Sequence, residues 1–430
     1  MCSKLEQAQF LEIGLPISRG GLGLPDLVAE APNAYFSSVL AVLQRWRDFL
    51  PDGSNFLQRW VAPSQPPSYL QEAHATVAKI VKDTDEHAGQ TQIIIPDSVV
   101  DLMNFAAVDK LQQRLNKRLH DKMETRLRTT VLTSVKARAQ YLSKTTAMAA
   151  ACLSAVPSDR ALSLANSDFT WFLRSHFRLP YMAWLGVNND LKCYCRRQDK
   201  YGNMPVCSED HVLKCSGDNL WLMRHNAIVS ASQDMLQSTQ LSPKLEQIVA
   251  PGSDLRFDLT VEGLDSMGTQ YCLDISVRHP HNSRIEKQTA RLQLHAANEG
   301  VKEKQTKYSK FIKGNTKFLP IVLETFGAVH PNVRELVALA AKRVNNIPYD
   351  SATFAAPTFA VYWLQRLSVT LQRENAKLAY LIALRSKEHH GDGAVEDITN
   401  LESFAMDTQV LQEEEQQDET QLNQQVHTWA

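Results

Sequence analysis

This sequence of 430 residues contains no apolar run as long as the roughly 18 residues that a membrane-spanning helix needs. Its first residues, MCSKLEQAQFLEIG, lack the basic-then-apolar order of a secretory signal peptide. Both absences favour an intracellular protein that is neither secreted nor bound to a membrane. In such a protein we expect the seven cysteines to be metal ligands or free thiols rather than disulfides.

Basic residues are missing from the C-terminal end. Residues 388–430 contain 11 acidic residues and no Lys or Arg, which predicts an acidic, disordered tail. Residues 1–387 therefore keep all 46 Lys and Arg but only 36 of the 47 acidic residues, a net charge of +10. A basic body of this kind is compatible with a nucleic-acid partner.

The N-terminal half is expected to be mostly helical. Residues 1–95 form a helical segment with a Pro-rich break, VAPSQPPSYL, and residues 96–187 form a basic helical region. Residues 110–144 carry ten Lys or Arg against two acids, so this region is either a solvated helix face or a surface that lies along phosphates. A stripe at i, i+4 spacing predicts its packed side: Leu111, Leu115, Leu119, Met123 and Leu127.

A cysteine-rich segment, CYCRRQDKYGNMPVCSEDHVLKC, follows this region. Five potential ligands lie within 23 residues, which is typical of a structural zinc site with thiolate ligands. For the four positions we select Cys193, Cys195, His211 and Cys215, with Cys207 as the substitute. The alternative is a set of buried free thiols with a chance histidine.

Arg224, His225 and Asn226 begin the next helical segment, WLMRHNAIVSASQDML. Beside a zinc knuckle, these three side chains could contact a phosphate or orient a substrate. The alternative is that they are structural residues of an amphipathic helix.

The segment RFDLTVEGLDSMGTQYCLDISVRHP, residues 256–280, predicts two half-buried strands joined by a turn near Ser266. Asp258 and Asp274 stand opposite each other in this hairpin, although aspartate is depleted from strands and like charges repel there. Two converging carboxylates can share a hard divalent cation such as Mg²⁺ or Mn²⁺. The alternative is a solvent-facing hairpin with two unrelated acids.

A helix is predicted after the hairpin, because Ser283 and Glu286 have the spacing of a capping box. Lys304 falls on the packed face of this helix, where a lysine is unfavourable unless it meets a partner. We expect that partner to be the aspartate pair on the sheet. The face has steps of three and four residues: Ala290, Leu294, Ala297, Val301, Lys304, Tyr308 and Ile312.

The order H-x3-C, Arg-His-Asn, R-x-D, a second Asp, and a downstream Lys and Lys-Tyr resembles the C-terminal part of site-specific non-LTR retrotransposon polyproteins. In that family a Cys/His zinc knuckle precedes a restriction-like endonuclease of the PD-(D/E)XK type. LPISRGGLGLPDL looks like the segment after the reverse-transcriptase domain, and FTWFLRSHFRLPYMAW looks like the region before the knuckle. The resemblance covers most of residues 10–345.

The resemblance implies that Asp258 and Asp274 bind a catalytic Mg²⁺ or Mn²⁺, beside the structural zinc. Lys304 would stand in for a catalytic lysine that has moved from strand to helix, with Lys307 as the alternative. Glu246, on a helix before the first strand, would assist the metal. The implied partner is DNA, with RNA as the alternative, without a small-molecule cofactor, and the implied location is the nucleus.

Two departures from the family pattern bear on activity. The Pro-Asp of the family is Phe257-Asp258 here, and the Asp-x-Lys position is Asp274-Ile275-Ser276, without its lysine. The sequence also has no Asp-Asp dipeptide, so the paired acids of a reverse transcriptase are missing and no polymerase activity is expected. The chain looks like a fragment or relic of a longer element, and a catalytically inactive relic that only binds nucleic acid is the alternative function.

The expected fold class is α+β, with the mostly helical N-terminal half followed by three further modules. Residues 188–232 would form the zinc knuckle and the Arg-His-Asn helix. Residues 233–345 would form a restriction-endonuclease-like domain, a mixed sheet flanked by helices. Residues 346–387 would form a C-terminal helix before the tail.

Overall fold

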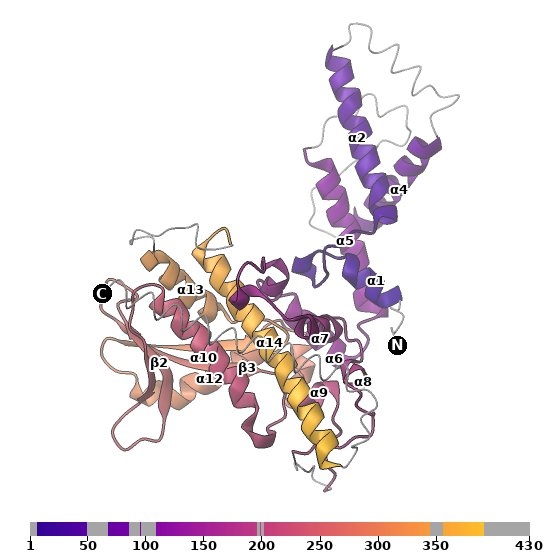
Figure 1. Cartoon of the computed structure of the whole chain (residues 1–430). Helices are drawn as coiled ribbons and strands as arrows, with labels where there is room; N and C mark the ends of the chain where they lie inside the picture. Colours follow the sequence, from indigo (N-terminus) through magenta and orange to yellow (C-terminus); the bar gives the residue numbers. More distant parts are fainter. Residues whose placement is uncertain are drawn as a thin grey trace. The chain divides into compact units, whose positions relative to one another are not determined.

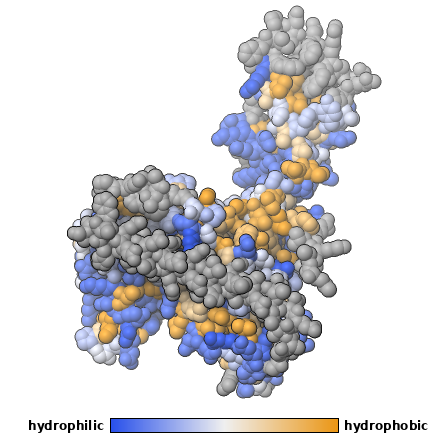
Figure 2. All heavy atoms as spheres, viewed as in Figure 1, coloured by the Kyte–Doolittle hydropathy of each residue, from blue (hydrophilic) through white to orange (hydrophobic). Residues whose placement is uncertain are grey.

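The computed structural model describes residues 7–49, 68–85, 95, 109–195, 198, 202–344 and 356–390 (Figure 1). It divides the chain into two compact units, Met1–Thr133 and Ser134–Ala430. None of the described helices is long and apolar enough to cross a membrane. On the face drawn in Figure 2, the coloured residues are of mixed hydropathy, and the apolar ones gather in several separate patches.

The first unit is helical in its described part. Its α-helices pack around one apolar cluster, to which Phe36, Leu70 and Leu115 contribute from three different helices. The predicted stripe is confirmed, since Leu111, Leu115, Leu119 and Leu127 are buried. The helices are α1 (Gln7–Gly14), α2 (Leu27–Phe49), α4 (Ser68–Asp85) and α5 (Leu111–Thr130).

The second unit is a mixed α+β structure around one long helix, α14 (Phe359–His389). The first half of α14 packs on the sheet with α10 (Trp221–Gln237), and its second half packs on the cysteine-rich segment. Figure 1 shows α14 in yellow running the length of this unit. The shorter helices before the sheet are α6 (Val135–Lys144), α7 (Asn166–His176), α8 (Tyr181–Trp184) and α9 (Glu209–Val212).

The sheet has the strand order β1-β2-β3-β4, formed by Lys244–Ile248, Arg256–Glu262, Gln270–Arg278 and Thr316–Glu324. The first three strands are antiparallel and β4 is parallel to β3, so the expected mixed sheet is confirmed. Between β3 and β4 the chain forms α11 (Glu286–Thr289) and α12 (His295–Tyr308), as a parallel pair requires a crossover. After β4 it forms α13 (Pro331–Val344).

Both faces of the central strands are covered, so the prediction of half-buried strands is wrong. Leu259, Thr260 and Val261 are all buried, because α10, α13 and α14 cover one face while α12 packs on the other. The alternation also breaks at Asp258. Phe257 leaves the main core and joins a small cluster with Tyr308 of α12.

The single helix predicted after the hairpin is wrong as well. It is two helices, since Leu294 has a left-handed backbone (φ 60°) and interrupts the helical path before α12. The capping box does not form: Ile285 precedes the first turn of α11 and makes no side-chain cap. The C-terminal helix begins at Phe359 rather than 346, and residues 346–355 and most of the tail lie outside the described residues.

Candidate functional site

The two aspartates of the hairpin lie side by side. The ladder of β2 and β3 ends at the pair Leu259–Leu273, and Asp258 and Asp274 are the next residues on the two strands. The Ile275 amide donates a hydrogen bond of 2.5 Å to Asp258 Oδ2, which turns this carboxylate toward β3. The side chains are only 14% and 6% exposed, so both charges are largely removed from water. Such carboxylates need a cationic partner.

Lys304 supplies one such partner. It lies on α12 between the buried Val301 and Tyr308, as the helical phasing predicts, and its ammonium forms an ion pair with Asp274 Oδ2. Burial raises the pKa of Asp274, although the nearby Lys304 acts in the opposite direction. The crossing helix thus brings an ammonium group to the Asp274 carboxylate.

Tyr308 holds the other oxygen of the same carboxylate. Its hydroxyl lies 3.1 Å from Asp274 Oδ1 and 2.8 Å from the Arg256 carbonyl oxygen, and its one proton can be donated to either acceptor. Burial, together with the negative charge of Asp274, raises the pKa of Tyr308 well above its usual range. Sequence reasoning placed Tyr308 on the packed face but gave it no role. The signal was its position one turn beyond Lys304.

The three residues Arg224, His225 and Asn226 of α10 lie in different environments. His225 Nε2 lies 3.4 Å from Asp258 Oδ1, so this ring reaches the aspartate pair. Arg224 is buried and donates hydrogen bonds to Asn375 Oδ1 (2.7 Å) and the Leu213 carbonyl (3.3 Å), and burial lowers its pKa to about 10. The expectation that Arg224 contacts a phosphate is therefore corrected, because its donors already serve the core. Asn226 is exposed.

These groups line a cavity of about 430 Å³. Asp258, Asp274, His225 and Lys304 all face it, and the exposed Lys307 lies at its side, with Nζ 4.8 Å from the centre of the Tyr308 ring. The cavity is large enough for water molecules and a phosphate group. It brings both polarities together, since it offers carboxylates for a cation and ammonium groups for an anion.

Glu246 is not placed as expected. It belongs to the edge strand β1 rather than to a helix, and its side chain is 62% exposed, 3.6 Å from the Arg256 guanidinium. It does not line the cavity. The helix before the sheet, α10, ends at Gln237 and brings His225 rather than an acid to the site.

Ser276 lies on β3, two residues after Asp274. It lines the cavity, and its buried hydroxyl has no hydrogen-bond partner among the described residues. Asp274 Oδ2 likewise accepts no well-directed hydrogen bond in the described part of the chain, so the Lys304 ion pair is its close contact. An unpartnered hydroxyl beside two carboxylates fits an oxygen-ligated cation with its water molecules.

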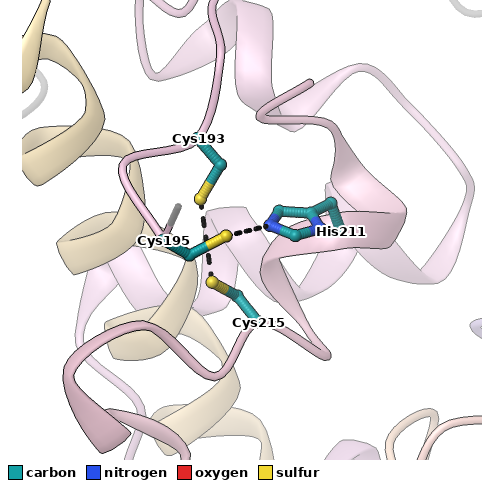
Figure 3. A group of neighbouring side chains, drawn as sticks. All are labelled: Cys193, Cys195, His211 and Cys215. Atoms are coloured by element: carbon teal, nitrogen blue, oxygen red, sulfur yellow. Dashed lines mark hydrogen bonds between the residues drawn. The ribbon is translucent and has the colours of Figure 1, made fainter. Parts of the chain in front are cut away.

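A second group of side chains lies in the cysteine-rich segment (Figure 3). The ligand atoms of Cys193, Cys195, His211 and Cys215 all lie within 4.8 Å of one another. Cys193 Sγ is 3.7 Å from Cys215 Sγ, and Cys195 Sγ is 3.5 Å from His211 Nε2. The structure thus gathers the four side chains that the sequence analysis selected, and Cys207 is outside this group.

Local backbone structure builds this group. The Cys193 amide donates to the Pro205 carbonyl and the Cys207 amide to the Leu191 carbonyl, which closes the loop that carries the first two thiols. Ser208 caps α9 by accepting from the His211 amide at 3.3 Å, which sets the histidine toward the sulfurs.

The electrostatics of these thiols suits a soft metal ion. Hydrogen bonds with Cys207 and Cys215 hold the pKa of Cys193 well below its usual range. The hydrogen bond with Cys193 in turn raises the pKa of Cys215. Three sulfurs and one imidazole nitrogen form the donor set of a closed tetrahedral site.

Comparisons with protein families and with curated proteins find no match for this chain. A function must therefore be argued from these two sites.

Proposed function

We propose that this chain is a metal-dependent DNA endonuclease that nicks a target strand by hydrolysing a phosphodiester. The observation that carries the proposal is the convergence of Asp258, Asp274 and Lys304 at one cavity from β2, β3 and α12. The order of motifs, and the mixed sheet with flanking helices, agree with the resemblance to the restriction-like endonucleases of non-LTR retrotransposons. The nuclear location implied by that resemblance belongs to the same proposal.

Asp258 and Asp274 would hold Mg²⁺ or Mn²⁺, which supplies charge stabilisation and an acidic bound water when present. The residues of the chain provide the rest of the chemistry. Tyr308 and the Ile275 amide orient the carboxylates, because each donates to one of them. Lys304 pairs with Asp274 in this structure, and if a bound cation displaced it, its ammonium would hold a phosphate oxygen or a water molecule.

His225 has a separate role in this proposal. Its ring lies against Asp258 from the opposite element, α10, and also faces the cavity. A neutral imidazole there can accept a proton from the attacking water or donate one to a phosphate oxygen. The two departures from the family pattern are compatible with activity. The proline of the family, which is Phe257 here, does no chemistry, and Lys304 would replace the strand lysine.

The cysteine-rich segment would hold a structural zinc ion through Cys193, Cys195, His211 and Cys215. All four positions are filled by the protein, which leaves no open position for a reaction. The segment packs on the second half of α14, whose first half packs on the sheet. Zinc would therefore stabilise the body that carries the aspartates.

A second function, nucleic-acid binding without cleavage, is favoured by one observation. The Lys304 ammonium forms an ion pair with Asp274, so it already neutralises the carboxylate that a metal ion would need as a ligand. If this ion pair is permanent, the aspartates are structural and the basic surface is what remains for nucleic acid.

The test is a nicking assay on supercoiled plasmid with Mg²⁺ or Mn²⁺ and the full-length protein. Asp258→Asn and Asp274→Asn should each lower the nicking rate by about 100-fold or more, since each removes a metal ligand. Asp190→Asn, which alters an exposed aspartate outside the cavity, is the matched control and should leave the rate unchanged. Wild-type protein that binds DNA but never nicks it would favour the second function.

A further inference from the structure

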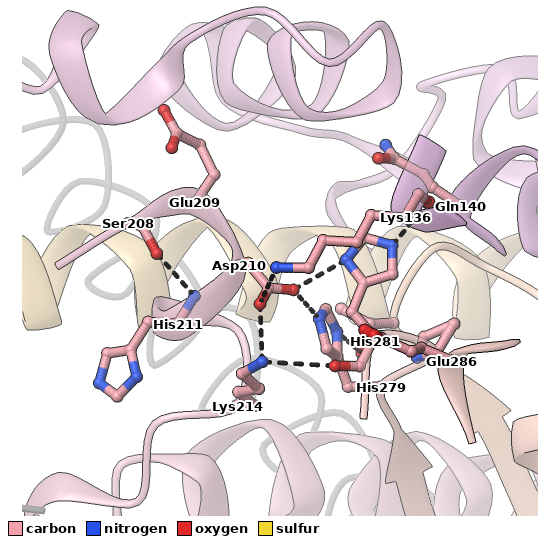
Figure 4. A network of polar contacts seen from close by, with 12 residues as sticks. Lys136, Gln140, Ser208, Glu209, Asp210, His211, Lys214, His279, His281 and Glu286 are labelled. Atoms are coloured by element: carbon pink, nitrogen blue, oxygen red, sulfur yellow. Dashed lines mark hydrogen bonds and ion pairs between the residues drawn. The ribbon is translucent and has the colours of Figure 1, made fainter. Parts of the chain in front are cut away.

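A third cluster of side chains lies on the other side of α9 (Figure 4). Asp210 of α9 meets His279 and His281, which directly follow β3, and the ligand atoms of the three residues lie within 4.8 Å of one another. Asp210 Oδ1 is 3.0 Å from His279 Nε2 and 2.8 Å from His281 Nδ1. Both histidine side chains are only 7% exposed. The proposed nuclease chemistry uses none of these residues.

The outer nitrogen of each histidine ring already has an acceptor. His281 Nε2 lies 3.0 Å from the Lys136 carbonyl oxygen, which can only accept, so this nitrogen carries a proton. His279 Nδ1 lies 3.2 Å from Thr325 Oγ1, whose hydroxyl donates to the Arg278 carbonyl. In the neutral rings, both inner nitrogens therefore direct lone pairs at an ionised carboxylate oxygen. Three acceptors that converge in this way are stabilised by a positive charge between them, which is either a metal ion or a proton on one histidine.

The surroundings match those of protein metal sites. Metal-binding histidines usually donate their other N–H to a carbonyl or hydroxyl oxygen, and metal-binding carboxylates are themselves hydrogen-bonded. Here Asp210 Oδ2, the oxygen turned away from the histidines, accepts from Lys214 (2.6 Å) and Lys136 (3.0 Å). Both lysine side chains are partly exposed, at 38% and 52%, so solvent screens their repulsion of a cation.

Distance and access also fit an ion. Two ligands of a tetrahedral ion, each at about 2.0 Å, lie about 3.3 Å apart. The observed separations of 2.8 and 3.0 Å need to open by less than 1 Å to admit the ion. Asp210 and His281 line a cavity of about 340 Å³, which provides an entry path.

We propose that Asp210, His279 and His281 form a second metal site, which takes a divalent transition-metal ion such as zinc. Two imidazole nitrogens and one carboxylate oxygen suit zinc better than Mg²⁺, which prefers oxygen ligands. Asp210 directly precedes His211 of the cysteine cluster, so ions at the two sites would hold α9 from opposite sides. The second ion would join α9 to the end of β3, the strand that carries Asp274.

Equilibrium dialysis of the reduced full-length protein against buffered zinc tests this site. Wild-type protein should bind one equivalent more than His281→Asn, which removes a nitrogen ligand and keeps a polar side chain. His330→Asn is the matched control, since His330 is a partly buried histidine of the same unit that bonds to the Asn332 amide. It should retain the full zinc content, whereas Cys215→Ala should lose only the equivalent of the cysteine cluster.

A cobalt titration of the wild-type protein and of His281→Asn distinguishes this site from the cysteine cluster and from the aspartate pair. Thiolate ligands produce an intense sulfur-to-cobalt charge-transfer band, which nitrogen and oxygen ligands do not. We expect one equivalent of Co²⁺ to produce that band in both proteins, and another, absent from His281→Asn, to add d–d absorption without it. A single thiolate-bound equivalent, or a His281→Asn protein with the zinc content of the wild type, would overturn the proposal and mean that a proton on His281 bridges it to Asp210. Either result leaves the nuclease proposal untouched.

Discussion

Asp274 is the residue on which the contacts of the candidate nuclease site converge. One of its oxygens meets the Tyr308 hydroxyl and the other meets the Lys304 ammonium, while Asp258 lies beside it on β2. The Tyr308 hydroxyl and the Lys304 ammonium favour the charged carboxylate, and Lys304 would also compete with a metal ion for it. The charge of Asp258 acts in the opposite direction and raises the pKa of Asp274. Substitutions of single residues around Asp274 therefore distinguish effects on the charge of this carboxylate from effects on the rate of nicking.

Lys304→Ala should lower the nicking rate by about 10²-fold or more, while Lys307→Ala should have a much smaller effect. The two lysines differ in what they contact: Lys304 forms an ion pair with Asp274, whereas Lys307 is exposed and its Nζ lies over the Tyr308 ring. Mn²⁺ affinity, measured by calorimetry, should not fall in Lys304→Ala, because the cation loses a competitor. Equal effects of the two substitutions on the rate would contradict the assigned role.

The raised pKa of Asp274 predicts a particular pH dependence of stability. A carboxyl whose pKa is higher in the folded than in the unfolded state binds its proton more tightly when folded. Its contribution to stability therefore falls as pH rises, from about pH 4 up through the folded pKa.

The measurement is urea denaturation in EDTA at a series of pH values. The difference in unfolding free energy between wild type and Asp274→Asn should decrease from about pH 4 upward and then level off. Asp190→Asn, an exposed control, should show a much flatter difference. A difference that grows with pH would mean that the ion pair with Lys304 outweighs the effect of burial.

At the scale of elements, the cysteine-rich segment depends on α14. Its own regular structure is short: one isolated bridge between Lys192 and Val206, and the four-residue helix α9. The buried cysteines pack instead against Ala379 and Ile382 of α14. A segment with so little regular structure in its described residues would gain much of its stability from a bound metal ion.

Substitution of each cysteine tests which side chains hold that ion. Cys193→Ala, Cys195→Ala and Cys215→Ala should each lose the zinc of this cluster and lower the melting temperature, because each removes a thiolate ligand. Cys207→Ala should keep the zinc, since its sulfur lies outside the group of four. Cys152→Ala is a further control: burial raises the pKa of this thiol to about 11, so it stays protonated. Zinc content is measured by mass spectrometry of the metal.

At the scale of the whole molecule, the charge is divided along the chain. Residues 1–387 have a net charge of +10, and the last 43 residues hold the balancing acids. Phosphate neutralisation releases counterions from nucleic acid, which makes binding weaken as salt rises. The acidic segment can compete with nucleic acid for the same basic side chains.

Binding of a DNA duplex should therefore show a linear fall of log K with log salt concentration, measured by fluorescence anisotropy. Deleting residues 391–430 should raise the affinity at low salt and have little effect at high salt, where charges are screened. A full-length variant with the acids of this segment changed to Asn and Gln should behave like the deletion. Affinity that does not respond to salt would exclude the basic surface as the binding site.

The sequence by itself determined the features that depend on local periodicity. The turn near Ser266 sets the register that pairs Leu259 with Leu273 and brings both aspartates to the end of that ladder, and steps of three and four residues bring Lys304 to the packed face of α12. The spacing of Cys193, Cys195, His211 and Cys215 was sufficient to choose the group that the structure gathers. In each case the residues are near in sequence, or lie on adjacent elements, so their geometry follows from the pitch of a helix or strand.

Only the tertiary structure decided what lies against each of these elements. Arg224 is buried because Asn375, 151 residues away, accepts its hydrogen bond, and no local pattern indicates such a partner. Glu246 is in a strand because its neighbours Leu245 and Gln247 pair with β2, a contact that outweighs local preference. Asp210, His279 and His281 meet because the end of β3 passes α9, some 70 residues earlier in the chain. Packing between distant segments sets these contacts, and the spacing of residues along one segment carries no information about them.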